Sequence, residues 1–171
     1  MGIMKRFLPL GGSLIILLFL IGVTQVSGMK LFIYNSTDSL PHGIYRIHSG
    51  AFQQGDLVVF VPPDQAKKII RNRHYLREEG YLMKYLVGKA GDSISTSNGQ
   101  FVVAGANYGE IFSHDKEGRA LPHYPFSDQV KEGYIVAVKG HNRSFDSRYF
   151  GPIPRASIIG RATPLWLFND R

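Results

Sequence analysis

The feature that most constrains this chain is an uncharged, strongly apolar stretch near its beginning. No charged residue occurs between Arg6 and Lys30, and residues 14–21 are continuously apolar. As a helix, the uncharged run would extend about 34 Å, which is enough to cross a hydrocarbon layer of about 30 Å. The sequence therefore predicts a transmembrane helix in residues 1–30 that anchors the chain, followed by one folded domain in residues 31–171.

The charges before this run predict its orientation. Lys5 and Arg6 favour a cytoplasmic N-terminus, which would place the domain on the periplasmic side of the inner (cytoplasmic) membrane. A cleaved signal segment is the alternative, because Pro9 shortens the strongly apolar part and residues 26–28 (Val-Ser-Gly) form an acceptable cleavage site.

Composition excludes several kinds of chemistry. The chain has no cysteine, so it has no disulfide framework, zinc thiolate site or cysteine nucleophile. Its six histidines show no metal-ligand spacing, and we expect neither a metal nor another cofactor. The net charge of +7 suits anionic lipid headgroups or acidic partners, whereas nucleic acid is not an expected partner behind a membrane.

After Lys30, short apolar runs separated by Gly and Pro indicate antiparallel strands joined by turns. We expect a mainly β fold: a compact antiparallel β domain with one short helix, which Asp64 would cap and which would end before Gly80. The segment from Gly105 to Ser127 is expected to be a long connection across the surface. Strands are expected over residues 31–34, 43–47, 56–60, 82–87, 93–96, 100–103, 134–138 and 158–167.

Ser39 lies directly after the first expected strand, in a turn that also contains Pro41 and Gly43. Such a turn presents a hydroxyl, and the amide of Ser39 together with the hydroxyl of Thr37 could face an oxyanion. An ordinary turn rich in Ser, Thr and Asp is the alternative interpretation.

Lys84 is unusual because it lies inside an apolar strand, on the same face as Leu82 and Leu86. If that face is buried, desolvation favours the neutral amine, which can accept a proton from a serine hydroxyl. The alternative is a lysine on an edge strand that discourages aggregation.

Residues 140–152 pack charged, hydroxyl and aromatic side chains into one loop. Asp146 could pair with Arg148 or orient the ammonium of a lysine base, and Ser144 could hydrogen-bond the amine. A purely structural ion pair is equally compatible with the sequence. A Ser-His-Asp arrangement, with His42 or His141 as base and Asp146 as orienting group, also stays open.

These segments, in this order after a membrane segment, resemble the signal-peptidase family, and more closely its conjugative-transfer branch, the TraF-type serine peptidases that mature pilin precursors. Leu40 in place of Met, and His141 in place of Asp, point to that branch. Residues 37–41 are similar to the family's nucleophile box, 55–60 to its next strand, 83–92 to its lysine box and 140–148 to its last box.

The resemblance implies a membrane-anchored serine endopeptidase with Ser39 as nucleophile and Lys84 as general base. It assigns supporting roles to Asp146, Ser144 and Arg148, and matches Thr37 to the oxyanion-hole position. The implied substrate is a membrane-held, pilin-like precursor that is cleaved and, in some members, cyclised; the implied partners are components of a conjugative transfer apparatus. A general signal peptidase I, and a non-enzymatic scaffold module of a secretion or pilus apparatus, are the alternatives.

Overall fold

The computed structural model describes residues 31–76 and 80–168. The predicted transmembrane helix falls in residues 1–30 and lies outside this part of the chain, so the anchor and the division at residue 30 stay predictions. Within the described ranges, no helix combines the length and the apolar character that a membrane span requires.

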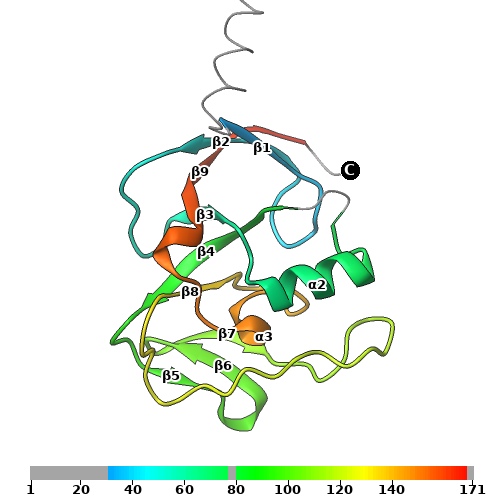
Figure 1. Cartoon of the computed structure of the whole chain (residues 1–171), viewed down its shortest axis with the longest axis vertical. Helices are drawn as coiled ribbons and strands as arrows, with labels where there is room; N and C mark the ends of the chain where they lie inside the picture. Colours follow the sequence, from blue (N-terminus) through cyan, green and yellow to red (C-terminus); the bar gives the residue numbers. More distant parts are fainter. Residues whose placement is uncertain (1–30, 77–79, 169–171) are drawn as a thin grey trace, which may run out of the picture.

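The described residues form nine strands in two antiparallel sheets (Figure 1). The larger sheet has the order β1-β2-β9-β3-β4-β8, and the smaller one has the order β5-β6-β7. All eight predicted strands are present, and the mainly β prediction is confirmed. The strands are β1 (Phe32–Asn35), β2 (Gly43–His48), β3 (Leu57–Phe60), β4 (Leu82–Lys89), β5 (Ile94–Ser95), β6 (Gln100–Val103), β7 (Ala106–Glu110), β8 (Tyr134–Ala137) and β9 (Ile158–Leu167).

The prediction of Gly105 to Ser127 as one irregular connection was wrong at its start. β6 and β7 form a hairpin in which Val103 pairs with Ala106. The two residues between them, Ala104 and Gly105, have φ angles of 49° and 78°, as a two-residue hairpin turn requires. The hairpin escaped prediction because Ala rarely adopts such an angle and because β7 is polar and only partly buried.

Two α-helices are present in the described chain, where one was expected. α2 (Asp64–Arg73) begins after Pro63, which occupies the N-cap position, so the prediction of Asp64 as the cap was wrong. Asp64 is instead the first helical residue, and its carboxylate accepts a hydrogen bond from Lys67. The second helix, α3 (Ser147–Phe150), is a single turn and lies in the loop predicted to carry chemistry.

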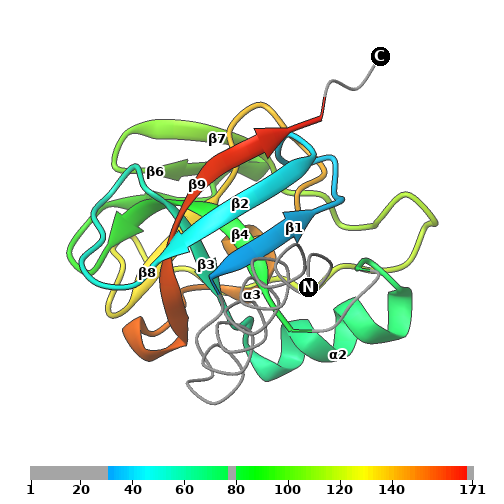
Figure 2. The same cartoon turned by 90° about the horizontal axis from the view of Figure 1, so that it is seen from above.

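Burial explains how the layers hold together. β3 lies between β9 and β4 and is buried on both faces, as expected for a central strand of a covered sheet. β1, β2 and β9 lie side by side at one end of the folded domain, and the β5-β6-β7 sheet lies toward its other end (Figures 1 and 2). Three core clusters fill the interior, and they include Phe60 and Ile70, Tyr45 and Met83, and Phe101 and Ile135, respectively.

Candidate active site

The turn after β1 presents the hydroxyl of Ser39. β1 ends at Asn35, and the chain turns through residues 36–41 before β2 begins at Gly43. Position 43 requires glycine, because a Cβ would overlap the carbonyl oxygen of Trp166 on the neighbouring strand β9. This close packing of strands fixes the place at which the turn leaves the sheet.

A buried side chain that the sequence analysis did not single out organises this turn. Nδ2 of Asn35 donates to the backbone carbonyls of Thr37 (3.0 Å), Leu40 (2.9 Å) and Pro41 (3.1 Å). Its Oδ1 accepts hydrogen bonds from the N–H (3.2 Å) and the hydroxyl (2.8 Å) of Thr37. Asn35 thus satisfies polar groups that a tight turn leaves without regular partners. The signal that could have revealed it is the alternation of Asn35, Thr37 and Ser39 at every second position.

Thr37 lies beside the candidate nucleophile, with 3.4 Å between its hydroxyl oxygen and that of Ser39. An amide oxygen can only accept, so the single hydroxyl proton of Thr37 is donated to Asn35. The predicted oxyanion role of Thr37 therefore requires its hydroxyl to turn toward the substrate, and this role stays a prediction.

Lys84 meets Ser39 from the middle of β4. Its Nζ donates a hydrogen bond to Oγ of Ser39 at 2.7 Å, across 45 residues of sequence. The lysine is only 5% exposed, and Leu82 and Leu86 on either side of it are also buried. The condition set for a lysine base, a buried face of the strand, is therefore met, and because β4 lies between β3 and β8, the edge-strand interpretation is wrong.

Burial changes the chemistry of this lysine. Desolvation lowers the pKa of Lys84 from its ordinary value of 10.5 to about 8, because the apolar surroundings disfavour the ammonium. Two further groups act on this pKa in opposite directions: the carboxylate of Asp146 raises it and the guanidinium of Arg148 lowers it. Lys84 is thus a base that can be neutral near physiological pH.

Asp146 and Arg148 form a completely buried ion pair beneath the site, with both side chains 0% exposed and 2.8 Å between Nη2 and Oδ2. Nε of Arg148 also donates to Oδ1 of Asp146 at 2.9 Å, so the contact is bidentate. The remaining guanidinium protons go to the backbone carbonyls of Glu110, His141 and Asn142. Of the two partners predicted for Asp146, the structure shows Arg148.

Asp146 and its neighbour Ser147 also satisfy N–H groups at an edge of the larger sheet. β8 is the last strand of that sheet, and one N–H group within it and one directly after it donate to these side chains. Val136 N–H donates to Oγ of Ser147 at 2.9 Å, and Val138 N–H donates to Oδ2 of Asp146 at 3.3 Å. The last loop is thereby attached to the strand next to β4, which carries Lys84.

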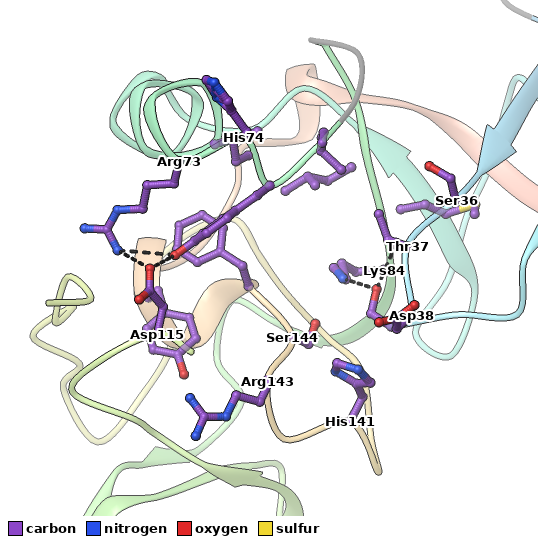
Figure 3. A pocket seen from close by; sticks show the side chains of 18 of the residues that line it. Ser36, Thr37, Asp38, Arg73, His74, Lys84, Asp115, His141, Arg143 and Ser144 are labelled. Atoms are coloured by element: carbon purple, nitrogen blue, oxygen red, sulfur yellow. Dashed lines mark hydrogen bonds and ion pairs between the residues drawn. The ribbon is translucent and has the colours of Figure 1, made fainter. Parts of the chain in front are cut away.

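Ser144 and His141 both belong to the last loop, and in Figure 3 both lie close to Lys84. Ser144 is 2% exposed, but within the described residues its hydroxyl has no hydrogen-bond partner, so the bond expected to the lysine amine is not formed. Burial, and secondarily the charge of Lys84, lowers the pKa of His141. Both residues flank the reactive pair without bonding to it.

A cleft of about 640 Å³ opens in front of these residues. One side consists of residues 32–39 and 81–84 together with part of the last loop. The opposite side consists of the end of α2 and residues 112–121. In Figure 3, Thr37, Asp38 and Lys84 lie on one side, and Arg73 and Asp115 lie on the other. A cleft of this size can hold a segment of peptide.

The other arrangements considered from the sequence receive less support. His42 lies 3.3 Å from Asp38, whereas the carboxylate of Asp146 is engaged by Arg148 and backbone N–H groups, so it does not orient a histidine. Across residues 31–76 and 80–168, no group of three or more His, Asp or Glu side chains could hold a metal ion.

Comparison with known proteins identifies the family. The family model described as "Signal peptidase, peptidase S26" matches residues 4–167. The chain belongs to the signal peptidase family. It is 28% identical over 174 residues to the plasmid transfer protein TraF of Escherichia coli, covering 95% of each chain. It is 31% identical over 176 residues to the conjugal transfer protein TraF of Agrobacterium fabrum, covering 96% of each chain.

Similarity extends to signal peptidases outside conjugation. A probable signal peptidase I-2 of a Synechocystis species is 32% identical over 113 residues, which cover 64% of this chain and 46% of that protein. A crystal structure of a signal peptidase I from Enterococcus faecalis is 24% identical with a TM-score of 0.40, covering 68% of this chain and all of that one. Membership of the signal peptidase family makes the chain a serine peptidase, whereas the roles of individual residues stay predictions.

Proposed function

We propose that this chain is a membrane-anchored serine endopeptidase in which Ser39 is the nucleophile and Lys84 is the general base. The observation that carries the proposal is the 2.7 Å contact between Nζ of Lys84 and Oγ of Ser39, made by a lysine that is almost completely buried. A nucleophile and a base within hydrogen-bond reach, with the base shifted toward neutrality, are what acyl transfer from a peptide requires.

In the acylation step, neutral Lys84 accepts the hydroxyl proton of Ser39 as Oγ attacks the scissile carbonyl carbon. The negative charge that develops on the carbonyl oxygen meets the Ser39 N–H and the Thr37 hydroxyl after that hydroxyl has turned from Asn35. The ammonium of Lys84 then donates its proton to the leaving amine as the peptide bond breaks. The product is an ester between Ser39 and the substrate acyl group.

The ester is resolved by a second nucleophile. Water or an amine attacks the same carbon and gives a proton to Lys84, and the proton returns to Oγ of Ser39 as the ester bond breaks. Attack by water is cleavage, and attack by the substrate's own amino group is cyclisation. Asp146 and Arg148 support both steps by setting the electrostatic field at Lys84.

Exposed apolar side chains beside the cleft support a position at the membrane surface. Seven large apolar residues of β1, the second half of β9 and their flanks are exposed, although such patches are uncommon on the surfaces of soluble monomers. Two of them, Phe32 and Tyr34, also line the cleft. We call this set the β1–β9 apolar patch; it consists of Leu31, Phe32, Tyr34, Leu165, Trp166, Leu167 and Phe168.

A catalytic domain that rests on the outer surface of the inner membrane through this patch would meet precursors as they emerge from the bilayer. The proposed substrate is a pilin-like precursor of a conjugative transfer system. The names of the TraF relatives, which refer to plasmid and conjugal transfer, support this choice. Components of the transfer apparatus are the proposed partners.

Mass spectrometry of candidate pilin precursors incubated with the purified, membrane-reconstituted protein tests the proposal. We expect the precursor to lose a terminal segment. If this segment lies on the C-terminal side of the scissile bond, the retained part is the acyl group on Ser39, and the product carries an added water after cleavage but not after cyclisation. Ser39→Ala and Lys84→Ala should each lower the rate by at least about 100-fold while the protein stays folded. Lys84→Ala with wild-type activity would refute Lys84 as the base.

Lys89→Ala is the matched control, because Lys89 lies at the end of the same strand β4 and is exposed. Its replacement should leave processing unchanged. If the wild-type protein cleaves no precursor and Ser39 reacts with no acylating reagent, the non-enzymatic scaffold interpretation replaces the peptidase.

A general signal peptidase is the second candidate, and the similarity to the Synechocystis signal peptidase supports it. The two candidates differ in substrate range and share their chemistry. Expression in a strain depleted of its own signal peptidase I distinguishes them, because only a general enzyme would restore growth.

A further inference from the structure

The far side of the cleft is held by a compact group of charged and hydrogen-bonded side chains that the mechanism above does not use. Asp115 is its centre, with a side chain only 8% exposed. Its Oδ2 accepts hydrogen bonds from Tyr75 (2.6 Å), Arg73 (3.1 Å) and Arg119 (2.7 Å). We call Arg73, Tyr75, Asp115 and Arg119 the Asp115 latch.

The latch joins two elements that are distant in the sequence. Arg73 is the last residue of α2 and Tyr75 follows it, whereas Asp115 and Arg119 belong to residues 112–121, which form the other part of the same wall. Arg73 also donates to the carbonyl of Ala120 at 2.7 Å. Hydrogen bonds from Tyr75 and Arg119 outweigh desolvation and hold the pKa of Asp115 well below its ordinary value, so its charge persists across the physiological range.

Residues 112–121 depend on such side-chain bonds because they belong to no strand. Their other attachments are to the last loop: Phe112 N–H donates to the hydroxyl of Tyr149 at 3.3 Å, and Arg143 lies 4.4 Å from the centre of the Phe112 ring. Arg143 also donates to the carbonyl of His114 at 3.4 Å. The segment is thus fixed near α2 by the latch and at the last loop by Phe112 and His114. Loss of the Asp115 carboxylate would leave the Arg73–Ala120 contact as the remaining hydrogen bond on the α2 side.

This wall faces the reactive pair across the cleft. In Figure 3, Arg73 and Asp115 lie on the side opposite Lys84 and Thr37, with the cleft between them. A peptide whose carbonyl reaches Ser39 must therefore pass between the Ser36–Ser39 turn and the wall. A small acyl donor needs to contact only the first of these sides.

We propose that the Asp115 latch is a specificity device that positions the 112–121 wall so that the enzyme grips an extended polypeptide chain. The proposal rests on the proposed function, since it assumes that the cleft receives the substrate of Ser39. Its four residues are positioning residues: they act on binding of the chain and leave the chemistry at Ser39 unchanged.

The test compares a long and a small substrate on the full-length protein in lipid nanodiscs. The long substrate is the pilin precursor of the experiment above, and the small one is p-nitrophenyl acetate, counted as the nitrophenolate release that Ser39→Ala removes. Asp115→Asn should lower kcat/KM for the precursor about tenfold, mainly through KM, because the wall is no longer held in place. Release from p-nitrophenyl acetate should stay within about twofold of wild type.

Asp64→Asn is the matched control, because it makes the same change in an exposed ion pair of α2, the Asp64–Lys67 contact of 2.9 Å. It should change neither rate. Tyr75→Phe removes the two hydrogen bonds of the Tyr75 hydroxyl, to Asp115 and from Arg73, and keeps the ring packing against Phe145. It leaves both arginines on Asp115, so it should raise KM in the same direction but less, even if Asp115→Asn folds poorly.

In the latch variants, two results would overturn the proposal: an unchanged KM for the precursor in both variants, or an equal fall in kcat/KM for the precursor and for p-nitrophenyl acetate. A wild-type protein that releases nitrophenolate through Ser39 but cleaves no precursor would also overturn it, while leaving Ser39 as a nucleophile. A wild-type protein with no Ser39-dependent reaction on either substrate would instead remove the proposed function itself.

Discussion

At the scale of single residues, burial gives Lys84 a reactivity that an exposed lysine lacks. An exposed lysine is charged at neutral pH and cannot accept a proton. In β4 the side chain is surrounded by apolar neighbours, and burial lowers the pKa of Lys84 to about 8. The 2.7 Å contact places this lysine against the hydroxyl of Ser39. Once the amine of Lys84 is neutral, it can accept the proton of that hydroxyl.

This pKa predicts the pH dependence of the reaction. Only neutral Lys84 can act as base, so kcat/KM should rise with pH and reach half of its plateau near pH 8. The measurement is the rate of precursor cleavage between pH 5.5 and 9.5 under conditions in which the protein stays folded. A profile that is flat from pH 6 to 9 would contradict a lysine base.

Asn35 gives a second prediction at this scale. Asn35→Ala removes the five side-chain contacts of Asn35 with the turn that carries Ser39 and leaves the buried carbonyl of Leu40 without its partner. We expect the free energy of unfolding to fall by about 1–3 kcal/mol and the processing rate to fall at least about tenfold. Urea unfolding and the cleavage assay measure the two effects.

Tyr45→Phe provides the comparison for Asn35→Ala. It removes a single hydrogen bond to the same turn, the 2.7 Å contact from the Tyr45 hydroxyl to the Pro41 carbonyl. Its effect on both quantities should be smaller. Equal effects of the two variants would mean that Asn35 has no special role in positioning Ser39.

At the scale of elements, β9 links the core to the outer surface. Its first half pairs with both β2 and β3, and Gly160 and Ala162 are buried there. Its second half pairs only with β2, and it carries Leu165, Trp166 and Leu167 into the β1–β9 apolar patch. Because the patch also borders the cleft, contact between this strand and a bilayer would bring the active site to the lipid surface.

Trp166 makes this contact measurable, because it is the only tryptophan of the chain and is 67% exposed. In the full-length protein reconstituted into vesicles, we expect its fluorescence to be quenched by lipids with brominated acyl chains. Acrylamide, a quencher dissolved in water, should quench the fluorescence of Trp166 less in the reconstituted protein than in the unfolded chain without detergent. Absence of quenching by brominated lipids would show that the patch does not lie on the membrane.

At the scale of the whole molecule, Arg148 connects parts of the chain that are otherwise separate. Its guanidinium binds Asp146 next to β8, the carbonyl of Glu110 at the end of β7, and the carbonyls of His141 and Asn142. The two sheets and the last loop therefore share one buried charge. Such a charge is costly without its partner.

Arg148→Met should lower the free energy of unfolding by about 3–5 kcal/mol, because the carboxylate of Asp146 then stays buried without its partner. The unpaired carboxylate should also raise the pKa of Lys84, since Arg148 no longer opposes it, and move the pH midpoint of activity upward. The double variant Asp146→Asn/Arg148→Met should be more stable than Arg148→Met alone. An unchanged pH midpoint in Arg148→Met would mean that the Asp146–Arg148 pair does not influence the pKa of Lys84.

The sequence by itself determined the strand pattern and the candidate residues. Alternation and Gly/Pro punctuation predicted eight strands, since these signals are local. The resemblance to the signal-peptidase boxes selected Ser39, Lys84 and Asp146, because the order of the boxes along the chain can be read without knowing the fold. Local signals also explain the errors: the capping of α2 and the β6–β7 hairpin depend on dihedral angles that composition only weakly specifies.

Only the tertiary structure decided which groups meet. Asn35 and Asp115 each look like an ordinary turn residue in the sequence, and both become buried centres of hydrogen bonding because distant segments fold onto them. The burial of Lys84 likewise depends on strands β3 and β8, which flank β4 in the sheet but are separated from it in sequence by residues 61–81 and 90–133. Sequence gives the chemical groups, and long-range packing sets their solvation and their partners, and with these their reactivity.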